Sequence, residues 1–183
     1  VETYQRDGVL LLQNMFDKDW IELLNKGLDT NIEAPTRRSR IWYKDTSGHS
    51  MFYDHTAWQD IEEYKKFIFN SPAAQICGRL TGSATINFFF DSVFVRSTGT
   101  QFETPWHQDE PYWSVEGHDS CSLWLPLVPV KRKSSLSFVP GSHHLKSVFK
   151  QYNFGDLNPE RKKNVDQVDF SEIAEQEFPD INA

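Results

Sequence analysis

Residues 104–113 read TPWHQDEPYW, and the fold and function predicted for this chain both depend on this stretch. In it a histidine, His107, and a carboxylate, Asp109, stand two positions apart among three aromatic residues. In an extended strand, residues i and i+2 point to the same side, so an imidazole nitrogen and a carboxylate oxygen can meet at one point. The pair therefore predicts a metal site, and the alternative is a strand histidine beside an exposed acid. Two histidines and one carboxylate on one face of an octahedron are the ligands of non-haem Fe(II) oxygenases.

Composition limits the classes of protein that this chain can belong to. Its 183 residues favour one domain with a buried core, and an aromatic content of 14% favours a β-rich core with aromatic-lined pockets. The net charge of −7 and the lack of a long basic run argue against nucleic acid as the main partner. No targeting segment and no run of about eighteen apolar residues is present, which predicts a soluble, cytoplasmic protein without a membrane partner. Two distant cysteines, Cys77 and Cys121, are expected to be buried free thiols.

Helical patterns dominate the first part of the chain, and strand patterns follow. Tyr4 to Gly8 resembles a helix end, and segment 31–58 shows no readable pattern. The expected helices are 18–28 with Asp17 as N-cap, 60–69, and 73–80 opened by Ser71-Pro72. The expected strands are 9–12, 85–95, 121–127 and 135–139, with a turn at 140–142 and a polar surface excursion over 151–183. This order fits an α+β arrangement, or a β-barrel with helices packed outside.

Three sequence blocks, in this order and spacing, resemble the phytanoyl-CoA dioxygenase family. They are TPWHQDEPYW at 104–113, SLWLPL at 122–127 and LSFVPGSH at 136–143, with looser likeness at 69–74 and 91–96. The resemblance implies a mainly β fold with flanking helices, namely a double-stranded β-helix (jelly-roll, cupin-like), in one oxygenase domain over 1–183. It also implies Fe(II), 2-oxoglutarate as co-substrate, and O2.

The resemblance also assigns roles to individual residues. His107 and Asp109 correspond to the first two iron ligands of the family. Trp124 corresponds to a tryptophan that lines the 2-oxoglutarate pocket, and Gln108 to a glutamine close to the co-substrate. Arg96 stands where relatives often carry lysine, which suggests a role near the carboxylates of 2-oxoglutarate.

The other residues considered for the site have either two possible roles or a purely structural role. Trp106, Tyr112 and Trp113 flank the ligand pair and either wall the substrate cavity or pack in the core. Four further histidines are expected to be structural, namely His49, His55, and the turn residues His143 and His144.

The family's third iron ligand, a distal histidine, and its arginine for 2-oxoglutarate are not identifiable in this sequence. We expect both beyond Ala183, together with the C-terminal strands of the fold. The function implied is hydroxylation of an unactivated C–H bond in a small organic molecule, since a carboxylate at position 109 argues against a halogenase. The alternatives are a 2-oxoglutarate-independent cupin-type metalloenzyme and a non-catalytic binding relative.

Overall fold

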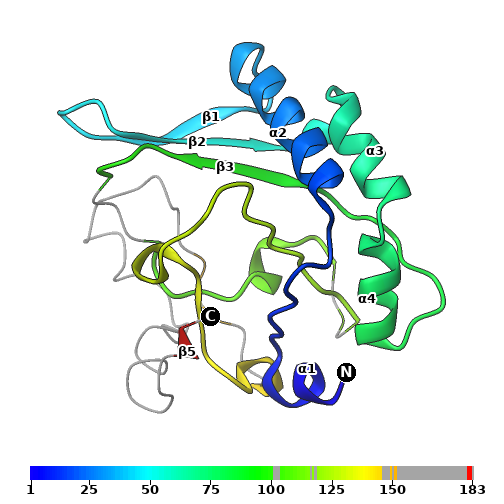
Figure 1. Cartoon of the computed structure of the whole chain (residues 1–183). Coiled ribbons are helices and arrows are strands. Elements are labelled where there is room, and N and C mark those ends of the chain that lie inside the picture. Colours follow the sequence, from blue (N-terminus) through cyan, green and yellow to red (C-terminus); the bar gives the residue numbers. More distant parts are fainter. Residues whose placement is uncertain are drawn as a thin grey trace. The chain divides into compact units, whose positions relative to one another are not determined.

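The computed structural model describes residues 1–100, 104–115, 117, 119–145, 149, 151 and 181–182. They belong to two compact units. The sheet unit comprises Leu12–Phe102 and Cys121–Pro129, and the terminal unit comprises Val1–Leu11, Glu103–Ser120 and Val130–Ala183. The elements are α1 (Glu2–Asp7), α2 (Lys18–Glu33), β1 (Arg40–Lys44), β2 (Ser50–His55), α3 (Glu62–Asn70), α4 (Ala73–Thr81), β3 (Ser92–Arg96), β4 (Ser137–Phe138) and β5 (Ile181–Asn182), as Figure 1 shows.

The sheet unit is built on a three-stranded antiparallel sheet in the order β1-β2-β3. Tyr53 is paired with Arg40 on one side and with Phe94 on the other. The register shifts between Ile41 and Tyr43, which places Trp42 at a bulge. The Trp42 ring stacks on that of Tyr53 with centroids 4.0 Å apart. Aromatic pairs of this kind stabilise neighbouring strands.

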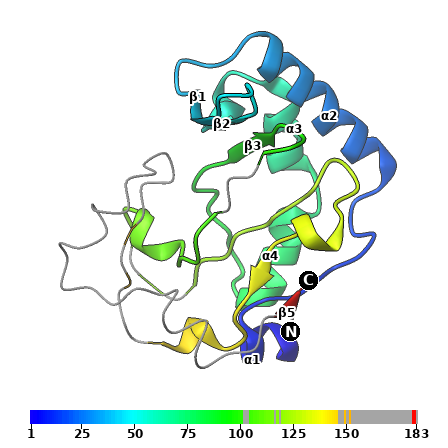
Figure 2. The same cartoon turned by 90° about the vertical axis from the view of Figure 1, so that its left-hand side faces the viewer.

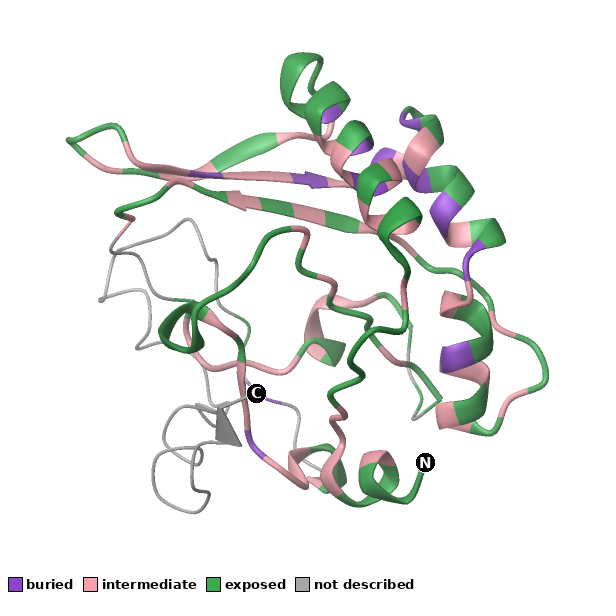
Figure 3. Cartoon of the chain, in the orientation of Figure 1, coloured by how far each residue is buried: buried purple, intermediate pink, exposed green. Residues whose placement is uncertain are grey.

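Helices α2 and α3 pack beside each other against one face of this sheet, as Figures 1 and 2 both show. Helix α2 begins where the Asp17 carboxylate accepts a hydrogen bond from the Trp20 N–H at 3.1 Å. Helices α2 and α3 and strand β2 all carry buried residues, which Figure 3 colours purple. The buried core consists of Leu24, Ala57, Ile61, Tyr64 and Phe67, with Val93, Leu125 and Leu127 among the side chains packed against it.

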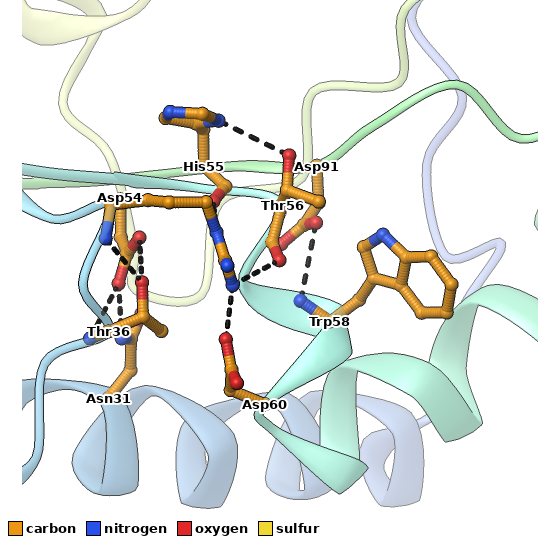
Figure 4. A network of polar contacts seen from close by, with 9 residues as sticks. Asn31, Thr36, Asp54, His55, Thr56, Trp58, Asp60 and Asp91 are labelled. Atoms are coloured by element: carbon orange, nitrogen blue, oxygen red, sulfur yellow. Dashed lines mark hydrogen bonds and ion pairs between the residues drawn. The ribbon is translucent and has the colours of Figure 1, made fainter.

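A polar network fixes strand β2 to helix α2 (Figure 4). The fully buried Asp54 carboxylate accepts hydrogen bonds from the Asn31 side-chain amide at 2.8 Å, the Thr36 hydroxyl at 2.8 Å and the Thr36 N–H at 3.2 Å. Next to it, the Arg38 guanidinium donates to the carbonyl of His55 and pairs with the exposed Asp60 carboxylate. A buried carboxylate is tolerated only when such donors surround it, so the network determines where α2 meets the sheet.

The terminal unit joins residues from both ends of the chain. Helix α1 ends at Gly8, which adopts a left-handed conformation with φ 75°. The N–H of Gly141, in the turn before a 3-10 helix at Ser142–His144, donates to the Asp7 carbonyl at 2.9 Å. Strands β4 and β5 pair antiparallel. Val139 and Phe149 form the buried core of this unit, with Trp106 and Leu145 packed against them.

The helix predictions are confirmed, although α2 continues to Glu33 rather than ending at residue 28. Segment 31–58, unreadable in the sequence, forms β1 and β2. The antiparallel sheet with flanking helices agrees with the predicted class, whereas a double-stranded β-helix is not confirmed. The predicted tail excursion over 151–183 lies outside the described residues except for 151 and 181–182.

Several strand predictions were wrong. Residues 9–12, 85–91 and 121–127 are described and form no strand, and of 135–139 only Ser137–Phe138 is a strand. A strand needs a neighbour to complete its backbone hydrogen bonds, and high β-propensity alone does not supply one. The chain reaches the sheet only at Asp91, directly before β3. The Asp91 carbonyl accepts a hydrogen bond from the Thr56 N–H at 2.9 Å.

Candidate metal site

The stretch that carries His107 and Asp109 is an irregular segment rather than the strand that we expected. Residues 104–108 have no regular secondary structure, and a 3-10 turn follows at Glu110–Tyr112. Asp109 adopts φ −76° and ψ −39° and accepts the Tyr112 N–H at 2.9 Å through its carbonyl. Trp106 packs on the core of the terminal unit and so anchors the segment next to the ligand pair.

The backbone nevertheless brings the two predicted ligands together. The Nε2 atom of His107 lies 3.3 Å from Oδ1 of Asp109. On the other side of the ring, Nδ1 lies 2.8 Å from the Pro105 carbonyl oxygen. Because a carbonyl oxygen can only accept a hydrogen bond, Nδ1 of His107 must carry the proton. In the neutral imidazole, Nε2 therefore carries the lone pair and faces Asp109. The Tyr112 ring approaches the imidazole edge-on, with centroids 5.9 Å apart.

This arrangement fits a first-row divalent metal ion. Two donors that each bind such an ion at about 2.1 Å, at right angles, are about 3 Å apart. The observed separation of 3.3 Å is close to that value. The hydrogen bond from Nδ1–H to a backbone carbonyl is the usual means by which proteins orient a ligand histidine. Among the described residues, no cluster of three or more His, Cys, Asp or Glu side chains could hold a metal ion, so the structure supplies two donors of the expected three.

The electrostatics of the pair follow from burial and from Asp109. Burial lowers the pKa of the His107 imidazole, but the hydrogen bonds to Asp109 and to the Pro105 carbonyl outweigh it and raise the pKa overall. The imidazole is largely buried, with 24% of its side chain exposed, whereas the Asp109 side chain is 55% exposed. The site therefore has one preoriented ligand and one that is open to solvent.

The other predicted site residues are divided between the two units. Gln108 and Trp113 are half-buried residues of the same segment as the ligand pair. Trp124 belongs to the sheet unit and is 48% exposed. Arg96 lies at the end of β3, where Nη2 approaches the Met51 sulfur at 3.7 Å and burial lowers the guanidinium pKa. The proposed roles of these residues remain predictions.

The histidines expected to be structural have ordinary structural contacts. His49, before β2, pairs with the Asp45 carboxylate at 2.7 Å. His55 stacks on Tyr53 with centroids 5.8 Å apart. His143 and His144 lie in the 3-10 turn after Gly141, and His143 Nε2 donates to a backbone carbonyl of α1 at 3.0 Å.

Comparison with known proteins identifies the family. The family model described as phytanoyl-CoA dioxygenase (PhyH) matches residues 4–172. The chain belongs to the phytanoyl-CoA dioxygenase family. The resemblance seen in the sequence is thereby confirmed, and because this is a family of Fe(II)- and 2-oxoglutarate-dependent oxygenases, a general oxygenase role follows. A search of the curated proteins and of the solved structures finds no significant match. In the described part of this phytanoyl-CoA dioxygenase family member, no helix has the length and apolar character needed to cross a membrane.

The sequence did not reveal the role of Pro105. Its carbonyl determines which imidazole nitrogen of His107 faces Asp109. Every residue has a backbone carbonyl, so the residue type at position 105 does not indicate this role. Only its position two residues before the histidine could have drawn attention to it.

Proposed function

We propose that this protein is an Fe(II)- and 2-oxoglutarate-dependent dioxygenase that hydroxylates an unactivated C–H bond of a small organic molecule. The observation that carries the proposal is the geometry of His107 and Asp109. Their donor atoms lie 3.3 Å apart, and the imidazole is held in the tautomer that directs Nε2 toward the carboxylate. Family membership supplies the reaction class, and this donor pair supports a metal centre at these two residues.

The chain's own part in the reaction is to bind and to orient. When bound, Fe(II) supplies the oxygen chemistry, in which 2-oxoglutarate is consumed to give succinate and carbon dioxide. His107 would hold the metal through Nε2, while Pro105 keeps the proton on Nδ1. Asp109 would hold the metal through its carboxylate, and a carboxylate at this position favours hydroxylation over halogenation.

The co-substrate and substrate residues are part of the same proposal. Gln108, Trp124 and Arg96 are proposed to contact 2-oxoglutarate, with Arg96 offering a permanent positive charge to a carboxylate. Of the three flanking aromatic residues, Tyr112 and Trp113 are proposed to wall the substrate cavity, whereas the contacts of Trp106 support core packing. The third ligand, a distal histidine, remains a prediction.

The test uses the full-length protein with Fe(II), ascorbate and 2-oxoglutarate, and measures succinate formation. His107→Ala and Asp109→Ala should each abolish succinate formation and weaken Co(II) binding, followed by its visible spectrum, by at least about tenfold. Glu110→Ala is the matched control, because this exposed carboxylate is adjacent in sequence and is not a proposed ligand. Normal succinate formation in Asp109→Ala would refute the ligand assignment.

A second measurement tests the co-substrate assignment alone. Under anaerobic conditions with Fe(II), 2-oxoglutarate should quench tryptophan fluorescence in the wild type, and Trp124→Phe should lose most of that quenching. Metal binding without any response to 2-oxoglutarate would point instead to a cupin-type metalloenzyme. Absence of metal binding altogether would point to a non-catalytic relative.

A further inference from the structure

One face of α4 and the segment that follows this helix form the two sides of an open cleft in the sheet unit. After Thr81 the chain turns back past the helix, as Figure 1 shows. The cleft has a volume of about 630 Å³ and is lined by residues of α4 and of segment 82–86. None of its lining residues has a part in the proposed oxygenase reaction. Small-molecule ligands occupy clefts of about this size.

A glycine at position 78 allows the two sides of the cleft to meet. The Ser83 N–H donates a hydrogen bond to the Gly78 carbonyl at 3.0 Å, and a Cβ atom at position 78 would lie 2.9 Å from the Ser83 carbonyl oxygen. The backbone after the helix therefore packs directly on α4 at this point. Next to it, the side chains of Ala74 and Ala84 are small and exposed, so they leave the space above the contact open.

Arg79, Gln75 and Ser83 supply the hydrogen-bonding side chains of the cleft. Gln75 and Arg79 are four positions apart on α4, so their side chains lie on the same side of the helix. Both are exposed, and neither forms an ion pair or a side-chain hydrogen bond within the part of the chain that the structure describes. An arginine in the last turn also complements the partial negative charge of the helix end. That role uses only the charge, and it leaves the N–H donors of the guanidinium for a ligand.

We propose that this cleft binds a small aliphatic monocarboxylate. The Arg79 guanidinium can present two parallel N–H donors to a carboxylate, and the Gln75 amide adds a donor one helical turn before it. Ile86 and the two alanines offer apolar surface to the carbon chain of the ligand. A ligand with two negative charges, such as a phosphate, fits less well, because the C-terminal end of α4 carries a partial negative charge.

The cysteines of the chain take no part in this site. We expected Cys77 and Cys121 to be buried free thiols, and both are free but only half-buried. Cys77 lies on α4, yet neither cysteine is among the residues that line the cleft. The ligand is therefore held by hydrogen bonds and apolar contacts, without a covalent step.

The experiment titrates isotope-labelled, full-length protein with hexanoate and follows the backbone amide and arginine side-chain resonances by NMR. We expect saturable shifts at Gly78, Gly82 and the Arg79 Nε–H, with a Kd on the order of 1 mM for so small a ligand. Hexylamine and inorganic phosphate should produce no saturable shift at these positions. The His107→Ala variant should bind hexanoate equally well, which separates this site from the proposed metal centre and from the proposed oxygenase function.

Variants of the exposed lining residues separate charge from shape. Arg79→Ala should weaken hexanoate binding by at least about tenfold, and Arg79→Lys should retain part of it, because lysine keeps the charge but not the paired donors. Ala84→Leu fills part of the cleft and should weaken binding while Arg79 stays in place. Arg37→Ala is the matched control, because Arg37 is an exposed arginine of the same unit that does not line the cleft, and binding should be unchanged.

Melting temperatures equal to that of the wild type show that each variant is folded. Unchanged hexanoate binding in Arg79→Ala, or the absence of saturable shifts in the wild type, would overturn the proposal. Phosphate binding as tight as that of hexanoate would overturn the assigned class of ligand.

Discussion

Replacement of Asp54 by alanine should destabilise the protein far more than any surface change. Asp54 is fully buried and accepts three hydrogen bonds, two from Thr36 and one from Asn31. The variant leaves the Asn31 amide, which is also fully buried, without its carboxylate acceptor. A hydrogen bond to a charged group contributes about 1.5–3 kcal/mol, and such contributions are not additive within one network. We therefore expect the free energy of unfolding to fall by about 3–5 kcal/mol.

The assay is urea denaturation with thermal unfolding as a second probe. For a chain of this size the expected loss corresponds to a decrease in melting temperature of roughly 6–20 °C. Asp60→Ala is the matched control, because Asp60 is an acid of the same region but its side chain is 53% exposed. Without Asp60, the mostly buried Arg38 guanidinium keeps the carbonyls of His55 and Thr56 as acceptors, so we expect a loss of about 0.2–1 kcal/mol. Equal losses in the Asp54→Ala and Asp60→Ala variants would refute the view that the buried carboxylate holds α2 to the sheet.

Three further predictions concern the core of the sheet unit. Burial raises the pKa of Asp91, so the folded state binds the carboxyl proton more tightly than the unfolded state does. The free energy of unfolding should therefore fall as pH rises from the ordinary Asp pKa of 3.8 through the folded pKa. Asp91→Asn, which keeps an oxygen acceptor for the Trp58 N–H, should flatten that slope in urea titrations between about pH 4 and pH 7; an unchanged slope would contradict the assignment. Tyr64→Phe should change the unfolding free energy by no more than about 1 kcal/mol in thermal melts, because its buried hydroxyl has no hydrogen-bond partner among the described residues; a larger loss would reveal one. Leu24→Ala should cost about 2–5 kcal/mol in the same melts, against about 0.5 kcal/mol for Leu11→Ala, whose side chain is 64% exposed, and similar losses would argue against the assigned core.

Features encoded over a few residues could be predicted from the sequence. Asp17 marks the start of α2 because its side chain caps the first turn, and Gly8 marks the end of α1 because glycine tolerates a positive φ. The pairing of His107 with Asp109 was also predictable, because two positions of chain keep the donors within reach even where no strand forms. Family membership was predictable from the blocks around these ligands.

Strands could be predicted much less well, because pairing is a long-range property. Segment 85–90 has high β-propensity, but these described residues pair with no other strand. Strands β1 and β2 lie in a polar and aromatic segment whose alternation is broken by the bulge at Trp42. The pairing of β2 with β3 joins segments far apart in the sequence, which local patterns do not reveal.

By itself, the sequence determined the helices, the chemistry of the His107 and Asp109 donors, and the family, since these depend on residues close together in the chain. Only the tertiary structure decided that Asp54 would be buried and bonded to Asn31 and Thr36. The reason is physical. Helix periodicity and caps act within a few residues, whereas burial, hydrogen-bond partners and the pKa of a buried carboxyl group such as Asp91 depend on side chains that folding brings together from distant positions.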